Sequence, residues 1–325
     1  MRIEDIGRIA VLGTGTMAPA IALLCSRLGY DVSIWGRSDA SLQRAFDRLK
    51  SHLQTYRENN LIQEEQVKPI LLRVAGVGNL EEAVRDADFV IEAVAEDLSL
   101  KKDIFSVVDS VCRKATIVAT NTSGLSITEL ASATNRPEKV VGTHFWNPPH
   151  MIPLVEIVRG EKTSEETIGV AAELMTRIGK TPVIVKKDVP GFIGNRLQFA
   201  LLREALHIVE QGIASIEDVD TTVKTSFGAR LPITGPLESA DLGGLDVYLA
   251  ISKYLMPDLC RSTEVSALLA DAVKKGRLGV KSGAGLYEWT PESISGIIKA
   301  REQELMRFFN SERTSSASPN AVEKD

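Results

Sequence analysis

A glycine-rich turn near the N-terminus constrains this chain more than any other feature of its sequence. Residues 8–12 (RIAVL) form a short apolar run, and residues 13–18 (GTGTMA) follow it with the spacing G-x-G-x-x-A. Residues 17–29 then have the pattern of a helix that ends at Gly29. A strand, a tight glycine turn and a helix in this order are typical of dinucleotide-binding domains.

Each position of this turn has a physical role in such a site. Gly13 permits the tight turn, and Gly15 lets the backbone approach a pyrophosphate. Thr16 and Met17 open the helix, whose free N–H groups and positive dipole end attract phosphates. We therefore predict that Gly13, Gly15, Thr16 and Met17 hold a dinucleotide cofactor.

The end of the second expected strand, 31–35, bears on which nicotinamide cofactor is bound. NAD sites usually have Asp or Glu here to bind the ribose hydroxyls, whereas this chain has Gly36, Arg37 and Ser38. Arg37 and Ser38 could pair with a 2′-phosphate, so NADP is slightly favoured over NAD. Arg37 could instead be an exposed cation, and Asp39 could be the acid or a helix cap.

Short apolar runs alternate with helical segments through the first half of the chain. Strands are expected at 8–12, 31–35, 88–93, 116–119, 140–145, 152–158 and 181–185. A single long helical stretch is expected over about 39–71. Alternation of this kind predicts βαβ units and a parallel sheet.

The pattern changes at 188–191 (DVPG), after which strand signals almost vanish. Helices are expected at 192–213, 215–226, 240–255 and 264–276. We predict a dinucleotide-binding domain over 1–187, a helical substrate and dimerisation domain over 188–310, and a disordered tail over 311–325.

Composition and charge argue against several classes of function. Lys and Arg total 38 against 43 Asp and Glu, so no basic excess is available for a nucleic-acid backbone. No signal peptide and no membrane-spanning run is recognisable. Cys25, Cys112 and Cys260 lie far apart without a Cys/His cluster, which predicts neither disulfides nor a metal site. We expect a cytoplasmic protein that acts on a small molecule.

One histidine and one glutamate stand where a dehydrogenase needs its base. His144 ends the strand 140–145, and Glu156 lies on the next run, 152–158. The Asn-Pro-Pro turn at 147–149 folds the chain back, so the two side chains can meet. Oxidation of an alcohol requires a base for the hydroxyl proton, and a carboxylate fixes the imidazole tautomer. We predict that His144 is this base and that Glu156 orients it.

Longer motifs are similar to those of the L-3-hydroxyacyl-CoA dehydrogenase family over nearly all of residues 7–290. They are GTGTMA (13–18), EAVAEDLSLK (92–101), NTSGLSI (121–127), THFWNPP (143–149), LVEIVRGEKTS (154–164), DVPGFIGNR (188–196) and GPLESADLGGLD (235–246). The resemblance implies a stand-alone, 3-hydroxybutyryl-CoA dehydrogenase-like enzyme of fatty acid metabolism. Its expected α/β fold is an N-terminal Rossmann domain with a doubly wound sheet, followed by an all-helical domain that makes a homodimer.

The resemblance also implies residue roles. The histidine of H-F-x-N-P is the family's base, here His144, and the glutamate of L-V-E-x-V orients it, here Glu156. The serine of N-T-S-x-L, here Ser123, contacts the reacting oxygen, and the asparagine of P-G-F-x-x-N-R, here Asn195, lines the same pocket. Family positions that contact the cofactor fall on Glu96, Lys101 and Asn147.

The substrate is left open by these residues. The leading hypothesis is hydride transfer between NAD(P) and the 3-hydroxyl of an L-3-hydroxyacyl-CoA. The second is the same chemistry on a CoA-free hydroxy acid or aldehyde acid of gulonate, carnitine or pyridine-carboxylate type. The helical arm that would meet CoA mixes acidic with basic residues, and His150 could contact an acidic substrate or lie at the surface. A third hypothesis, a non-catalytic crystallin-like protein, conflicts with the intact site residues.

Overall fold

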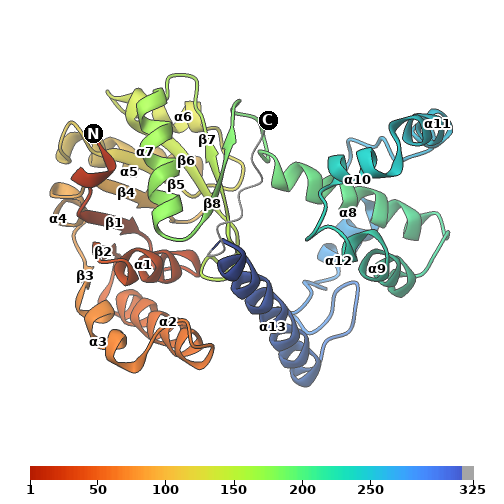
Figure 1. Ribbon diagram of the computed structural model, residues 1–325, viewed down its shortest axis with the longest axis horizontal. Helices are drawn as coiled ribbons and strands as arrows, with labels where there is room; N and C mark the ends of the chain where they lie inside the picture. The colour runs from red at the N-terminus through yellow and green to blue at the C-terminus, as the bar shows by residue number, and fades with distance from the viewer. Residues whose placement is uncertain (317–325) are drawn as a thin grey trace. The chain divides into compact units, whose positions relative to one another are not determined.

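The first half of the chain folds into one eight-stranded sheet (Figure 1). The strand order is β3-β2-β1-β4-β5-β6-β7-β8. The first six strands of this order, including β1 and β2, all run parallel to one another. This confirms the predicted doubly wound Rossmann fold. The strands are β1 (Arg8–Leu12), β2 (Asp31–Trp35), β3 (Val74–Val77), β4 (Phe89–Glu92), β5 (Ile117–Thr120), β6 (Val140–Phe145), β7 (Leu154–Val158) and β8 (Thr181–Val185).

The sheet departs from the predicted parallel arrangement at one edge, where the expected Asn-Pro-Pro turn reverses the chain. Strand β7 pairs antiparallel with β6, and β8 then runs parallel to β7. The reason is the length of the connection: only residues 146–153 join β6 to β7, and a parallel neighbour would need a crossover of about a dozen residues or more. The short turn therefore places β7 directly beside β6 in the opposite direction.

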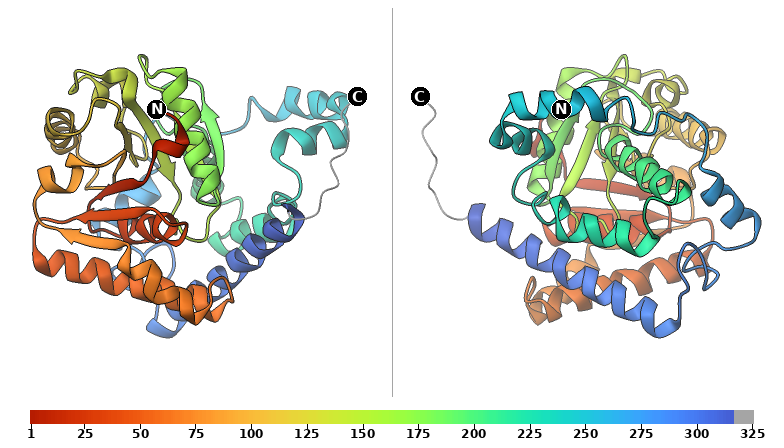
Figure 2. Two further views of the ribbon diagram at one scale, coloured as in Figure 1. Left: turned by 60° about the vertical axis from the view of Figure 1, so that its left-hand side comes forward. Right: turned by 90° about the vertical axis from the view of Figure 1, so that its right-hand side faces the viewer.

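Helices cover both faces of the sheet because their apolar sides have strands to pack against. Residues of α1, α2, α3 and α7 share one hydrophobic cluster, and residues of α4, α5 and α6 share a second. Figure 2 shows these helices flanking the sheet. Their bounds are α1 (Met17–Arg27), α2 (Asp39–Glu58), α3 (Glu64–Leu72), α4 (Leu80–Arg85), α5 (Leu98–Val111), α6 (Ile127–Ala131) and α7 (Glu165–Arg177).

Three local differences from the sequence-based expectation lie between residues 39 and 85. The expected helix over 39–71 is broken into α2 and α3, since Asn60 adopts a φ of 57°, a conformation that asparagine tolerates better than most residues. Strand β3 and helix α4 were not expected. Strand β3 is short and contains Gly76, which weakens its β signal, although Phe46 of α2 packs against that glycine.

The structure describes the backbone of residues 1–316 and the side chains of residues 1–307. The chain divides into one unit of Met1–Asn195 with the segment from Arg301 onward, and a second unit of Arg196–Ala300. The sequence-based boundary after residue 187 lies a few residues earlier. The remaining helices are α8 (Gly194–Glu210), α9 (Ile216–Thr225), α10 (Pro236–Gly243), α11 (Leu245–Leu255), α12 (Ala267–Lys274) and α13 (Pro291–Ser316).

The second half of the chain is helical, as predicted, with different helix ends. The helix expected over 240–255 is divided by Gly244, whose φ is 88°. Helix α13 was not expected, and it includes residues 311–316 of the segment predicted as a disordered tail. The rest of that segment, 317–325, lies outside the described residues. None of the described helices combines the length and apolar character that crossing a membrane requires.

Candidate active site

The glycine turn lies between β1 and α1, at the point of the sheet where β1 has β2 on one side and β4 on the other. Gly13 has a φ of 126°, and a Cβ there would come within 2.5 Å of the carbonyl oxygen of Ala93. A Cβ on Gly15 would meet no atom within 4 Å. Gly13 is therefore required by the turn itself, whereas Gly15 faces open space that a phosphate could enter.

A cavity opens beside this turn, and its walls come from the ends of three strands. Its lining includes Gly13 to Met17, the residues Trp35 to Arg37 at the end of β2, and Ala93 to Ala95 after β4. Crevices outside the carboxyl ends of parallel strands are where doubly wound sheets bind ligands. The residues present thus fit a dinucleotide, with the turn and the N-terminus of α1 available to its phosphates.

The residues after β2 have partly different surroundings from those expected. Arg37 lines the cavity, but the Ser38 hydroxyl accepts a hydrogen bond from the Ser41 amide at 3.3 Å and caps α2. Asp39 is in the first turn of that helix. Arg48 of α2, which sequence reasoning did not single out, donates to the carbonyl oxygen of Thr14 at 3.4 Å.

His144 and Glu156 meet directly, as register partners on β6 and β7. His144 Nδ1 is 2.8 Å from Glu156 Oε2, and the two residues are 5% and 1% exposed. Because partners in an antiparallel pair project to the same face, the short turn alone is enough to bring them together. The contact engages Nδ1 and leaves Nε2 as the imidazole nitrogen that can exchange a proton with a substrate.

The Glu156 carboxylate accepts hydrogen bonds from more than His144. Its Oε1 accepts the amides of Ile193 and Gly194 at 2.9 and 3.0 Å, and its Oε2 also accepts Trp146 Nε1 at 3.3 Å. Burial alone would raise the pKa of Glu156, but the hydrogen bonds from His144, Gly194 and Ile193 outweigh it and lower the pKa. The carboxylate is therefore held ionised beside the imidazole.

Ser123 and Asn195 are also brought together. Asn195 Nδ2, in the first turn of α8, donates to the backbone carbonyl oxygen of Ser123 at 3.0 Å. Asn121 Oδ1, just before Ser123, accepts the amide of Phe145 at 2.8 Å, which ties this loop to the strand that carries His144. Ser123 itself is exposed, so its hydroxyl is accessible to a ligand.

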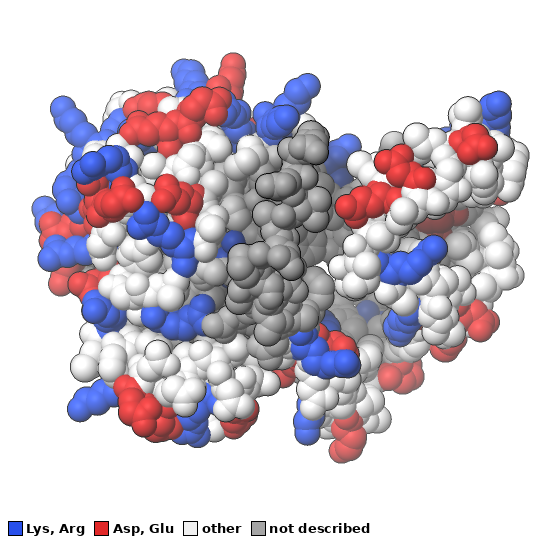
Figure 3. Space-filling view, in the orientation of Figure 1, with Lys and Arg blue, Asp and Glu red and all other residues white. Residues whose placement is uncertain are grey.

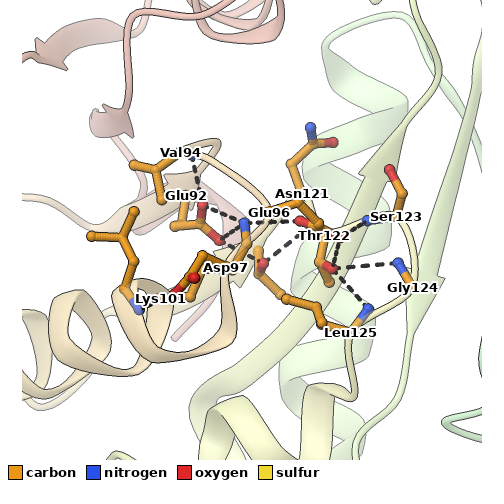
Figure 4. A network of polar contacts seen from close by, with 12 residues as sticks. Glu92, Val94, Glu96, Asp97, Lys101, Asn121, Thr122, Ser123, Gly124 and Leu125 are labelled. Atoms are coloured by element: carbon orange, nitrogen blue, oxygen red, sulfur yellow. Dashed lines mark hydrogen bonds and ion pairs between the residues drawn. The ribbon is translucent and has the colours of Figure 1, made fainter. Parts of the chain in front are cut away.

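Glu96 shapes the loop that carries Ser123 (Figure 4). Its Oε1 accepts the amide of Ser123 at 2.9 Å and the hydroxyl of Thr122. The Thr122 oxygen in turn accepts the amide of Leu125 at 2.9 Å. Glu96 therefore connects the segment after β4 to the loop after β5, a contact that sequence reasoning did not anticipate.

Lys101 lies within the protein, where it is 1% exposed. Its ammonium contacts both oxygens of Glu92 at 2.7 and 2.8 Å and lies 3.3 Å from Glu96 Oε2. Glu92 also accepts the Thr120 hydroxyl at 2.7 Å. The Lys101 ammonium thus pairs with two carboxylates of the protein, and Glu96 lies between Lys101 and the Ser123 loop (Figure 4).

The turn after His144 contains one exposed and one buried residue for which the sequence suggested a role. Asn147 is exposed and precedes the cis peptide bond to Pro148. His150 is buried, with its ring centroid 4.1 Å from that of His52. The surface position that the sequence allowed for His150 is therefore wrong, whereas a contact of His150 with an acidic substrate stays a prediction.

Gly13, Glu96, Ser123 and His144 all lie at or just after the carboxyl ends of neighbouring strands. A dinucleotide crevice at these strand ends, with a carboxylate-bound histidine beside it, defines a Rossmann-type dehydrogenase. The family model for the 3-hydroxyacyl-CoA dehydrogenase NAD-binding domain matches residues 8–189, and that for the C-terminal domain matches residues 191–289. The chain belongs to the 3-hydroxyacyl-CoA dehydrogenase family and is an oxidoreductase of this type.

Relatives within this family have more than one named activity. The chain is 38% identical over 307 residues to 5-formyl-3-hydroxy-2-methylpyridine 4-carboxylate 5-dehydrogenase of Mesorhizobium japonicum, covering 93% of this chain and 96% of that protein. It is 39% identical over 284 residues to 3-hydroxybutyryl-CoA dehydrogenase of Clostridioides difficile, covering 87% of this chain and 99% of that protein.

Solved structures of proteins with the same two kinds of name are also similar to this chain. A crystal structure of the pyridine-carboxylate dehydrogenase, described as an NAD+-dependent dismutase, superposes with a TM-score of 0.86 at 36% identity and covers 93% of this chain and 97% of its own. (S)-3-hydroxybutyryl-CoA dehydrogenase of Ralstonia eutropha gives a TM-score of 0.74 at 34% identity, covering 88% and 100%.

Proposed function

We propose that this protein transfers a hydride between NAD and the 3-hydroxyl of an L-3-hydroxyacyl-CoA, with His144 as the general base. The observation that carries the proposal is the His144–Glu156 pair, joined at 2.8 Å on the edge of the sheet that also holds the glycine turn. Neither residue alone would indicate a base, but a buried carboxylate bound to one imidazole nitrogen prepares the other for proton transfer.

The proposed reaction divides the work among residues of this chain. A bound NAD would supply the hydride acceptor for the carbon that bears the hydroxyl. His144 Nε2 accepts the hydroxyl proton, and Glu156 stabilises the imidazolium that forms. In the reverse direction, the Ser123 hydroxyl and the Asn195 amide are donors that could polarise the carbonyl oxygen. His144 then returns its proton to that oxygen.

The cofactor site is proposed on the turn and the strand ends around it. Gly13, Gly15, Thr16 and Met17 would meet the phosphates, and Asn147 would lie near the nicotinamide. Glu96 would reach the cofactor from its contact with the Ser123 amide. We propose that Lys101 acts through Glu96, because its ammonium is already engaged by Glu92 and Glu96.

We propose NAD as the preferred cofactor, in place of the slight preference for NADP that the sequence favoured. Ser38, one of the two residues expected to bind a 2′-phosphate, uses its hydroxyl to cap α2. Of these two residues, only Arg37 is in the lining of the cavity. Dissociation constants of the purified protein for NADH and NADPH test this choice, and tighter binding of NADPH would reverse it.

A CoA-free hydroxy acid or aldehyde acid is the second candidate substrate. It is favoured by the higher TM-score with the pyridine-carboxylate dehydrogenase, 0.86 against 0.74. Helix α2 and the face of the first unit in Figure 3 also mix acidic with basic side chains and present no uniform phosphate-binding patch.

NADH-coupled assays separate the two substrates. Acetoacetyl-CoA and L-3-hydroxybutyryl-CoA test the first, and free 3-hydroxy acids with pyridine aldehyde-carboxylates test the second. The proposal expects kcat/KM to be highest for a CoA thioester. A higher value for a free acid would move the substrate class to the second candidate and leave the role of His144 intact.

A homodimer is proposed from the apolar surface of α10 and α11. Five large side chains of these helices are more than half exposed in the single chain. They are Leu237, Leu242, Leu245, Leu249 and Tyr254. Exposed large apolar side chains gathered on two neighbouring helices are typical of protein interfaces, and a second copy of the chain would cover them. The predicted cytoplasmic location stays a prediction.

A further inference from the structure

The side chain of Trp146 packs against the imidazole of the proposed base and also contacts the carboxylate of Glu156. It follows His144 by two residues, and its ring centroid is 5.6 Å from that of the imidazole. Its Nε1 donates to Glu156 Oε2 at 3.3 Å, the same oxygen that contacts His144 Nδ1. A phenylalanine could fill much of this space, but it has no N–H to donate.

Gly194 leaves room for the indole. A Cβ at Gly194 would come within 2.3 Å of Trp146 Cζ2 and 3.1 Å of Cε2, so any larger residue would displace the ring. The same glycine donates its backbone amide to Glu156 Oε1 at 3.0 Å. Gly194 thus supports the Glu156 carboxylate in two ways. It donates its own N–H, and its lack of a side chain leaves room for the Trp146 indole to donate as well.

The other wall of the imidazole is aromatic as well. The ring of Phe192 is 5.6 Å from that of His144, in an edge-to-face arrangement, and Phe192 is fully buried. Phe192 is held at a φ of 51° just before the amides that reach Glu156. Phe192 packs against the imidazole without a polar group. Of the two aromatic neighbours, only Trp146 can therefore donate a hydrogen bond to the Glu156 carboxylate.

We propose that Trp146 is a positioning residue that acts through Glu156: its indole N–H shares the carboxylate charge and weakens the hold of His144 on a proton. A carboxylate that accepts more hydrogen bonds is a weaker partner for the imidazolium. The imidazole then stays neutral, and able to act as a base, at lower pH. The catalytic consequence rests on the proposed function, whereas the effect on His144 protonation does not.

The test is the NMR titration of His144 in the apoprotein, with the resonance assigned by comparison with His144→Gln. Trp146→Phe should raise the pKa of His144 by about 0.5–1 unit, which is a three- to tenfold tighter hold on the proton. The acid limb of the kcat profile for alcohol oxidation should move up by the same amount, with the NADH dissociation constant unchanged. Trp289→Phe, which removes an indole N–H in the second unit, should change neither.

An unchanged His144 titration in Trp146→Phe would overturn the inference and leave Trp146 as a packing residue. If that variant does not fold, replacement of Trp146 by 3-benzothienylalanine removes the N–H while keeping the ring shape, and the same shift is expected. A shifted titration in a protein that oxidises none of the substrates would uphold this inference while the proposed function fails. The two outcomes are therefore distinguishable.

Discussion

At the scale of single residues, two buried carboxylates of the sheet, Glu92 and Glu156, are each held by several donors. Lys101 contacts Glu92 and Glu96, and Glu156 has partners in two segments, 144–146 and 193–194. Buried charges are tolerated where each is paired and hydrogen-bonded. Both carboxylates therefore depend on their partners, and removing a partner has a predictable cost.

Lys101→Met should destabilise the protein strongly, because it leaves Glu92 buried beside Glu96 without a cation. Loss of one partner of a buried pair costs about 3–5 kcal/mol, and urea unfolding measures it. Lys102→Met is the matched control: Lys102 pairs with the more exposed Glu129 at 2.8 Å, and its loss should cost under about 1 kcal/mol. Equal stability of the two variants would show that the Glu92–Lys101 contact contributes little.

At the scale of elements, two buried basic residues, His150 and Lys180, lie at the turn between β6 and β7. Burial, with His52 and Lys180 nearby, lowers the pKa of His150 to about 3. Burial, with Arg27 nearby, lowers the pKa of Lys180 to about 7. Lys180 Nζ donates to the carbonyl oxygens of Pro149 and Ile152, and these two hydrogen bonds hold the turn in place.

His150→Phe should reduce the loss of stability in acid. The folded protein keeps His150 neutral down to about pH 3, whereas the unfolded chain binds a proton below about pH 6.5, so stability falls as the pH drops through that window. At pH 5 this amounts to about 2 kcal/mol. Urea unfolding at pH 8 and pH 5 should show a smaller difference in the variant than in the wild type or in His207→Phe. An unchanged difference would contradict the account of His150.

The elements also show what could be predicted from the sequence. The His144–Glu156 pair was predictable because a short turn joins two strands and fixes their register. Strand β3 was not, because its four residues include a glycine and its place depends on packing against β2 and α2. The contacts of Ile193 and Gly194 with Glu156 join segments that are distant in the sequence, so no local pattern predicts them. The burial of Lys101 likewise follows from packing that the sequence does not show.

At the scale of the whole molecule, the apolar surface of α10 and α11 predicts the oligomeric state. Sedimentation equilibrium should give twice the chain mass of 35.4 kDa. Leu245→Glu combined with Leu249→Glu should give the monomer, because two charges would have to be buried at the interface. Leu72→Glu, at an exposed leucine of α3, should leave the dimer intact. A wild-type protein that sediments as a monomer would contradict the prediction.

The central claim is that His144 exchanges the proton while the glycine turn holds the cofactor. The most direct measurement compares the wild type with His144→Ala in NAD-coupled oxidation of the best substrate and in NADH binding, with His207→Ala as control. The account predicts that kcat falls by about 10²–10⁴-fold, the usual contribution of a general base, while the NADH dissociation constant stays within about twofold. A variant that keeps the wild-type kcat would contradict it.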